Sequence, residues 1–87
     1  MNTFKLIVAS PDGNIFEGDV TKFDVRGALG ELAVMAGHIP FVTSVVPCAC
    51  TLWFDDDSKK TAKTDGGLLT VKSDSTIFMS GSFKFDE

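Results

Sequence analysis

The chain has no tyrosine, one tryptophan, one histidine and two cysteines among its 87 residues. It also lacks any apolar run near the roughly 20 residues that a membrane-spanning helix needs. The N-terminal stretch MNTFKLIVAS is too short for the apolar region of a signal peptide, because Pro11-Asp12-Gly13 interrupts it. We therefore expect no membrane span, and a chain that stays in the compartment where it is made.

Several classes of site lack the residues that they require. One histidine with a Cys-x-Cys pair does not provide the four ligands of a usual zinc site. Asp55-Asp56-Asp57 lacks the alternation of a calcium loop, so we interpret it as a solvated hairpin tip. The glycines at Gly27 and Gly30 form no phosphate-binding motif and are expected at turns. The sequence thus predicts no metal, no cofactor and no small-molecule substrate.

Positive charge is also scarce. Eight Lys and Arg against twelve Asp and Glu give a net charge of −4, with no basic stripe to neutralise phosphates. Nucleic acid is therefore a poor candidate partner, and we expect protein partners instead. Cys48 and Cys50 flank Ala49, and in a strand they would lie about 6.5–7 Å apart, at or beyond disulfide reach. We expect two reduced, packed thiols.

What is present indicates one folded β domain. Apolar residues make up 44% of the chain and include eight Phe, so a real core is expected. Short alternating runs are separated by turn signals every 6–12 residues or so, without sustained helical periodicity. This pattern predicts an all-β, flattened antiparallel β-sandwich of about ten short strands in a single domain. The expected runs are 4–10, 14–18, 19–26, 32–35, 41–46, 48–54, 60–64, 67–72 and 76–80.

The same alternation predicts a core and an exposed surface. The core candidates are Phe4, Leu6, Val8, Val25, Leu32, Val34, Leu52 and Met79. Adjacent apolar pairs occur at Ile15-Phe16, Val45-Val46, Leu68-Leu69 and Ile77-Phe78. Neighbours in a strand point to opposite faces, so one member of each pair points away from the core. In a two-layer domain these residues form an exposed apolar patch, which is typical of a protein interface.

The histidine lies in GELAVMAGHIP, between Gly37 and Ile39. Catalysis would need a partner that orients the imidazole and a nucleophile or substrate in reach. Its sequence neighbours offer neither, although the fold could bring Ser44, Ser80 or Asp24 close to it. The alternatives are a simple turn or a contact surface for a partner, and we expect a protein that is not an enzyme.

A carrier domain of the lipoyl or biotinyl kind is an alternative function for a small β-sandwich. Such domains present a modified lysine at a hairpin, flanked by Asp-Lys-Ala or Met-Lys-Met. Lys59-Lys60 follows three aspartates here, and no lysine has those flanks. Another small protein-binding β-sandwich module is the remaining alternative.

Five segments in this order resemble one known family: FKLIVASPDG at 4–13, IFEGDV at 15–20, GxxGELAV at 27–34, GHIPFVTS at 37–44 and GGLLTV at 66–71. The family is the N-terminal β-sandwich domain of the epsilon subunit of the rotary ATP synthase, called delta in mitochondria. Two loops depart from its usual pattern, at Ala36-Gly37-His38 and at Pro47-Cys48.

The resemblance implies a non-catalytic central-stalk subunit that binds the gamma subunit and the ring of c subunits. It would help couple proton or sodium translocation to ATP synthesis. It implies contacts with the c ring at Gly30 and Glu31, and contacts with gamma near His38, Thr43 and Ser10.

The family's place in the cell and its usual length supply two further expectations. The subunit would be peripheral on the cytoplasmic face of the bacterial inner membrane, with the plastid thylakoid surface as the alternative. Most bacterial and plastid relatives continue into a C-terminal helical hairpin. We expect residues 1–87 to form only the sandwich domain, with that hairpin absent.

Overall fold

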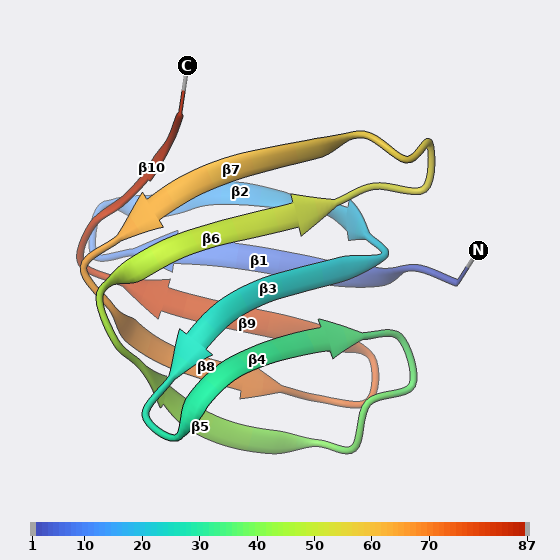
Figure 1. Cartoon of the computed structure of the whole chain (residues 1–87), viewed down its shortest axis with the longest axis horizontal. Helices are drawn as coiled ribbons and strands as arrows, with labels where there is room; N and C mark the ends of the chain where they lie inside the picture. Colours follow the sequence, from blue (N-terminus) through green and yellow to red (C-terminus); the bar gives the residue numbers. More distant parts are fainter. Residues whose placement is uncertain (1, 87) are drawn as a thin grey trace.

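The computed structural model describes residues 2–86, which form ten β-strands and no helix (Figure 1). Each strand is short, and most adjacent strands are joined by tight turns. The strands are β1 Phe4–Ser10, β2 Gly13–Val20, β3 Lys22–Gly27, β4 Gly30–Met35, β5 Phe41–Val45, β6 Cys48–Trp53, β7 Lys59–Thr64, β8 Gly67–Val71, β9 Ser75–Ser80 and β10 Phe83–Phe85.

The strands form two layers that are continuous at one corner. The pairing order is β10-β7-β6-β3-β5-β8-β9-β1-β2, and β4 pairs with the other side of β3. The corner is the single pairing of Gly27 in β3 with Val45 in β5. In Figure 1, β3, β4, β6 and β7 lie in front of β1, β8 and β9, and the molecule measures 30 × 29 × 24 Å. The predicted all-β sandwich is confirmed.

The core lies between the layers. It is formed by the inward-pointing residues, which occur at every second position of most strands. Its largest members are Phe23 from one layer and Phe78 from the other, whose ring centroids are 5.9 Å apart. The ring of Phe83 packs edge-on against that of Phe78, with their centroids 6.0 Å apart. The other buried apolar residues are Leu6, Val8, Val20, Val25, Val34, Val45, Cys50, Leu52, Ala62, Leu69 and Val71.

Five of the eight core candidates are buried, and one is wrong. Phe4 and Leu32 are only partly buried, although both pack against the core. Met79 is 56% exposed. The inward residues of β9 are Thr76, Phe78 and Ser80, so alternation directs Met79 outward. Because Thr76 and Ser80 are polar, the sequence pattern did not indicate that they point inward.

Two features of the strand arrangement were not predicted. β1 pairs with β9 in parallel, from Lys5 opposite Ser75 to Ala9 opposite Met79, whereas all other pairs are antiparallel. Pairing partners distant in sequence leave no local turn signal. The three-residue strand β10 is too short for a periodic pattern.

A buried polar cluster joins β7, β8 and β9 at one end of the sandwich. Thr64 and Ser80 are buried, and their hydroxyl oxygens are 2.7 Å apart. The Ser80 hydroxyl lies 2.9 Å from the Gly66 carbonyl oxygen, and the Ser82 amide donates to Asp65 Oδ1 at 3.0 Å. In the part of the chain described, every buried side-chain N or O atom has a hydrogen-bond partner.

The register of β9 can be tested with two neighbouring substitutions. Phe78→Ala removes a fully buried ring that packs on Phe23 and Phe83, and we expect it to lower the free energy of unfolding by about 3–5 kcal/mol. Met79→Ala should change it by about 0.5 kcal/mol or less, because that side chain is exposed. Urea denaturation measures both. A larger loss for Met79→Ala would contradict the described register.

Candidate functional site

The turn between β3 and β4 carries the two residues expected to meet the c ring. Gly27 pairs with Gly30, and Gly30 has a φ of 126°, a conformation that favours glycine. The tip residue Leu29 is fully exposed. Glu31 lies 3.9 Å from the Arg26 guanidinium in a solvent-exposed ion pair, so its carboxylate remains accessible. The turn presents one apolar side chain beside one carboxylate.

His38 lies at the opposite end of β4 from Gly30, in the loop to β5. Its amide donates to the Met35 carbonyl oxygen at 3.2 Å, which closes the turn. The imidazole packs on Phe41, with ring centroids 4.9 Å apart, and Nδ1 is 2.9 Å from the Ile39 carbonyl oxygen. Within residues 2–86, neither Ser44, Ser80 nor Asp24 bonds to this ring. The geometry is that of a half-buried side chain presented by a turn.

Ser10 and Thr43 have local structural bonds and lie in different parts of the sheet. The Ser10 hydroxyl donates to the Gly13 carbonyl oxygen at 3.1 Å and accepts the Asp12 amide at 3.2 Å, which stabilises the β1–β2 turn. Thr43 is half-buried in β5 opposite Leu69. The structure therefore does not gather the five expected residues into one site.

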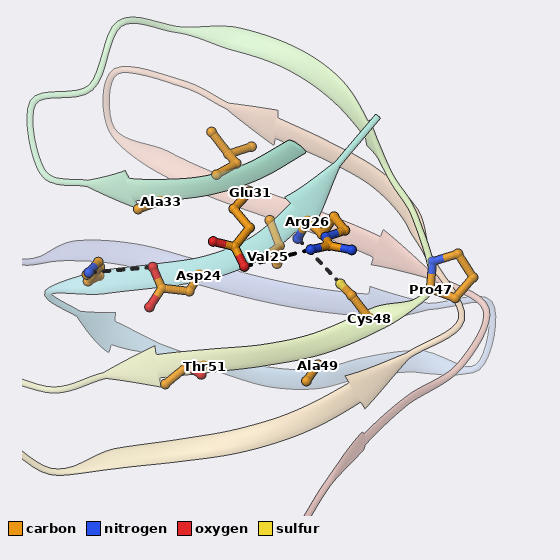
Figure 2. A pocket seen from close by; sticks show the side chains of 11 residues that line it. Asp24, Val25, Arg26, Glu31, Ala33, Pro47, Cys48, Ala49 and Thr51 are labelled. Carbon is orange, nitrogen blue, oxygen red and sulfur yellow. Dashed lines mark hydrogen bonds and ion pairs between the residues drawn. The ribbon is translucent and has the colours of Figure 1, made fainter. Parts of the chain in front are cut away.

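A groove of about 700 Å³ crosses the outer surface of β3, β4 and β6 (Figure 2). Its charged side chains already have partners: Lys22 lies 3.7 Å from Asp24, and Arg26 pairs with Glu31. Ala33, Pro47, Ala49 and Thr51 contribute short side chains to its wall, as Figure 2 shows. Because no charged group is left unpaired, the groove offers no evident chemistry.

The buried thiol of Cys50 is unsuited to nucleophilic or metal chemistry. Burial, with a smaller contribution from Cys48, raises the pKa of Cys50 to about 12. Cys48 Sγ accepts a hydrogen bond from the Arg26 amide at 3.4 Å (Figure 2), and both cysteines are free, as expected. Across residues 2–86, no three His, Cys, Asp or Glu side chains are grouped to hold a metal, and no helix is long and apolar enough to cross a membrane.

The lysines at the β6–β7 hairpin do not have the arrangement of a carrier domain. The hairpin tip is formed by Asp55 to Ser58, and Asp57 adopts a φ of 67° there. Lys59 and Lys60 begin β7, where their ammonium groups lie 5.1 Å from the Trp53 ring centroid and 5.6 Å from that of Phe85. Neither is presented at the tip.

The outer surface of β5, β8, β9 and β1 is an apolar face. It is formed by Val42, Leu68, Ile77, Met79, Ile7 and Ala9. Register aligns Leu68, Met79 and Ala9 across three strands, and Ile77 with Ile7 in the next row. Val42 is 61% exposed and Leu68 46%. Inward Leu69 and Phe78 sit beside outward Leu68 and Ile77, so these two adjacent pairs divide between the faces as predicted.

The sequence is similar to known ATP synthase chains. Residues 3–84 match the family model described as ATP synthase, Delta/Epsilon chain, beta-sandwich domain. The chain is 32% identical over 87 residues to the ATP synthase epsilon chain of Clostridium perfringens strain SM101, covering 100% of this chain and 65% of that relative. It is 33% identical over 85 residues to the sodium ion specific epsilon chain of Acetobacterium woodii, covering 98% of this chain and 64% of the relative. It thus spans about two thirds of these curated relatives.

Two solved structures share the fold. A chain of the Euglena gracilis mitochondrial ATP synthase, from an OSCP/F1/c-ring structure, superposes with a TM-score of 0.89 at 20% identity, over 95% of this chain and 53% of that one. A chain from the central stalk and c-ring of the Tetrahymena thermophila mitochondrial ATP synthase gives 0.77 at 10% identity, over 94% and 66%.

Alkylation can test the described thiol environments. At about pH 8, iodoacetamide should modify half-buried Cys48 and leave Cys50 unmodified, because the buried Cys50 thiol stays protonated. Intact mass should show one added group in buffer and two in urea. Rapid modification of Cys50 in the folded chain would contradict its burial.

Proposed function

Because the chain belongs to the family of ATP synthase delta/epsilon chain β-sandwich domains, we propose that it is a central-stalk epsilon subunit that binds gamma and the c ring. In this function it performs no catalysis of its own and holds no cofactor. It transmits rotation between the ring and gamma, and so helps couple proton or sodium translocation to ATP synthesis. It is peripheral to the cytoplasmic face of a bacterial inner membrane, through the complex.

The observation that carries this proposal is the apolar face. Exposed apolar patches of this kind mark protein interfaces, and here the side chains lie on four neighbouring strands of one rigid sheet. We assign the apolar face to gamma. Rigid strands suit a part that must transmit torque, because a flexible docking segment would absorb the rotation.

Two of the three residues expected near gamma, Ser10 and His38, lie next to strands of this face. Ser10 follows Ala9 of β1, whereas the Thr43 side chain is directed inward from β5, opposite buried Leu69. His38 is in the loop that enters β5 and packs on Phe41. An apolar centre with a polar rim is the usual arrangement of a protein interface. His38 therefore acts as a rim contact, neither as a base nor as a metal ligand.

The β3–β4 turn suits a second, smaller contact. Leu29 and Glu31 project from the end of the front layer, and Glu31 keeps most of its surface in solvent. A carboxylate at this turn complements an arginine on a polar loop of the c ring. As an exposed pair it contributes only about 0–1 kcal/mol, so its main role is orientation.

Opposite faces of the sandwich allow a matched test of gamma binding. Met79→Lys places a charge in the apolar face and should weaken binding to purified gamma by about ten-fold or more. Met35→Lys is the control, since Met35 has a similar exposure of 52% but lies beside Lys22 in the other layer. Titration calorimetry measures both affinities. Equal losses, or a larger loss for Met35→Lys, would refute the assignment.

Cross-linking in the assembled complex tests the two ends of β4 separately. Glu31→Cys should form a disulfide with a cysteine placed in the c loop, and His38→Cys with one placed in gamma. In a binding assay Glu31→Ala should cost at most about 1 kcal/mol, and Glu31→Lys more, because it replaces attraction by repulsion. If neither position cross-links while Asp56→Cys does, the orientation is wrong.

A further inference from the structure

A second surface, on the other layer of the sandwich, gathers positive charge in a chain whose net charge is −4. This lysine face consists of Lys59 and Lys63 of β7, Lys84 of β10 and Trp53 of β6. Register places Lys59 beside Trp53 and Lys63 directly opposite Lys84. All three lysines are exposed. Four of the chain's eight cationic side chains belong to β7 and β10 once Lys60 is included.

No ion pair among residues 2–86 neutralises these lysines. The ion pairs found among residues 2–86 involve Lys5, Lys22 and Arg26, and none involves Lys59, Lys63 or Lys84. Asp86 lies nearby and its carboxylate accepts the Thr61 hydroxyl at 2.8 Å, but within residues 2–86 it forms no ion pair with these lysines. Like charges directly opposite on adjacent strands are destabilising, so the Lys63–Lys84 pair does not help the fold.

Protection of a sheet edge explains only part of this arrangement. Lysines on edge strands discourage pairing with other chains, and Lys84 lies on the edge strand β10. Lys63 lies on the part of β7 that is paired on both sides, with Ala49 of β6 and Lys84 of β10, whereas Lys59 lies beyond the residues that β10 pairs with. An internal position has no edge to protect, so Lys63 requires another explanation.

Trp53 adds an aromatic ring of fixed position to the lysine face. The Lys59 ammonium lies 5.1 Å from the ring centroid and that of Lys22 lies 5.9 Å away. The indole N–H donates to Asp24 Oδ2 at 2.8 Å, which fixes the ring on the surface. Tryptophan is enriched in protein interfaces, and a ring held in position loses little freedom when a partner binds.

We propose that the lysine face binds an acidic segment of a partner protein. Lys59 and Lys63 are four residues apart in one strand, about 13 Å, so the segment must present carboxylates over at least that length. Carboxylates of this chain, Asp24 and Asp86, lie among the cations and would repel a continuous anionic bilayer. A discrete protein segment can place its own charges between them.

This proposal goes beyond the assignment of gamma to the apolar face and does not depend on it. The two surfaces lie on different layers, so the substitutions that test one leave the other intact. Loss of gamma binding through Met79→Lys and loss of acidic-peptide binding through the lysine face are separate results.

Binding of a decaglutamate peptide to the full chain at low ionic strength tests the proposal. Trp53 is the only tryptophan, so its emission reports occupancy of this surface directly. We expect a saturable change in emission that salt suppresses. Lys63→Gln/Lys84→Gln should raise the Kd by about ten-fold, and the matched control Lys5→Gln/Lys72→Gln by less than about three-fold.

Two companion measurements separate this role from a structural one and from membrane binding. Lys63→Gln/Lys84→Gln should melt at the same or a higher temperature than the unmodified chain, and Lys63→Arg/Lys84→Arg should retain binding. No saturable binding, equal losses in the two glutamine pairs, or a lower melting temperature of the lysine-face variant would overturn the proposal. Binding to phosphatidylserine vesicles in place of the peptide, lost with the same lysines, would also overturn it.

Discussion

The architecture depends on one constraint: a two-layer β-domain can cover only one face of each strand. Side chains alternate, so every adjacent apolar pair sends one member into the core and one to the outside. Leu69 and Phe78 enter the core, while Leu68 and Ile77 face outward beside Met79. The apolar face is a direct result, and it is concentrated on β5, β8, β9 and β1.

Much of the fold follows from local sequence. Alternation, turn residues at Ser10-Pro11-Asp12-Gly13 and the absence of helical periodicity suffice to predict a small β-sandwich and most of its strands. Local patterns fail where pairing is distant or where inward residues are polar. No local turn connects β1 with β9, so the sequence carries no local signal of their parallel pairing. Thr76 and Ser80 point inward in β9, which made Met79 look like the core residue.

The sequence predicted what type of surface the candidate site is, but only part of where its residues lie in the fold. The sequence suggested an exposed apolar patch and a contact turn at Gly30-Glu31, both of which are exposed in the structure. It could not show that His38 lies at the other end of β4, packed on Phe41. It also suggested no basic stripe, because Lys63 and Lys84 are far apart in the chain and meet only through the β7–β10 register.

The two outer surfaces give the domain distinct chemical sides, one apolar and one cationic, on a rigid sandwich. The central claim is that the apolar face is the one covered by gamma. Methionine oxidation measures this directly, because Met79 and Met35 are similarly exposed on opposite layers. Peptide mass spectrometry after peroxide treatment should show both oxidised in the free chain. With gamma bound, Met79 should be protected and Met35 should not; protection of Met35 alone would contradict the account.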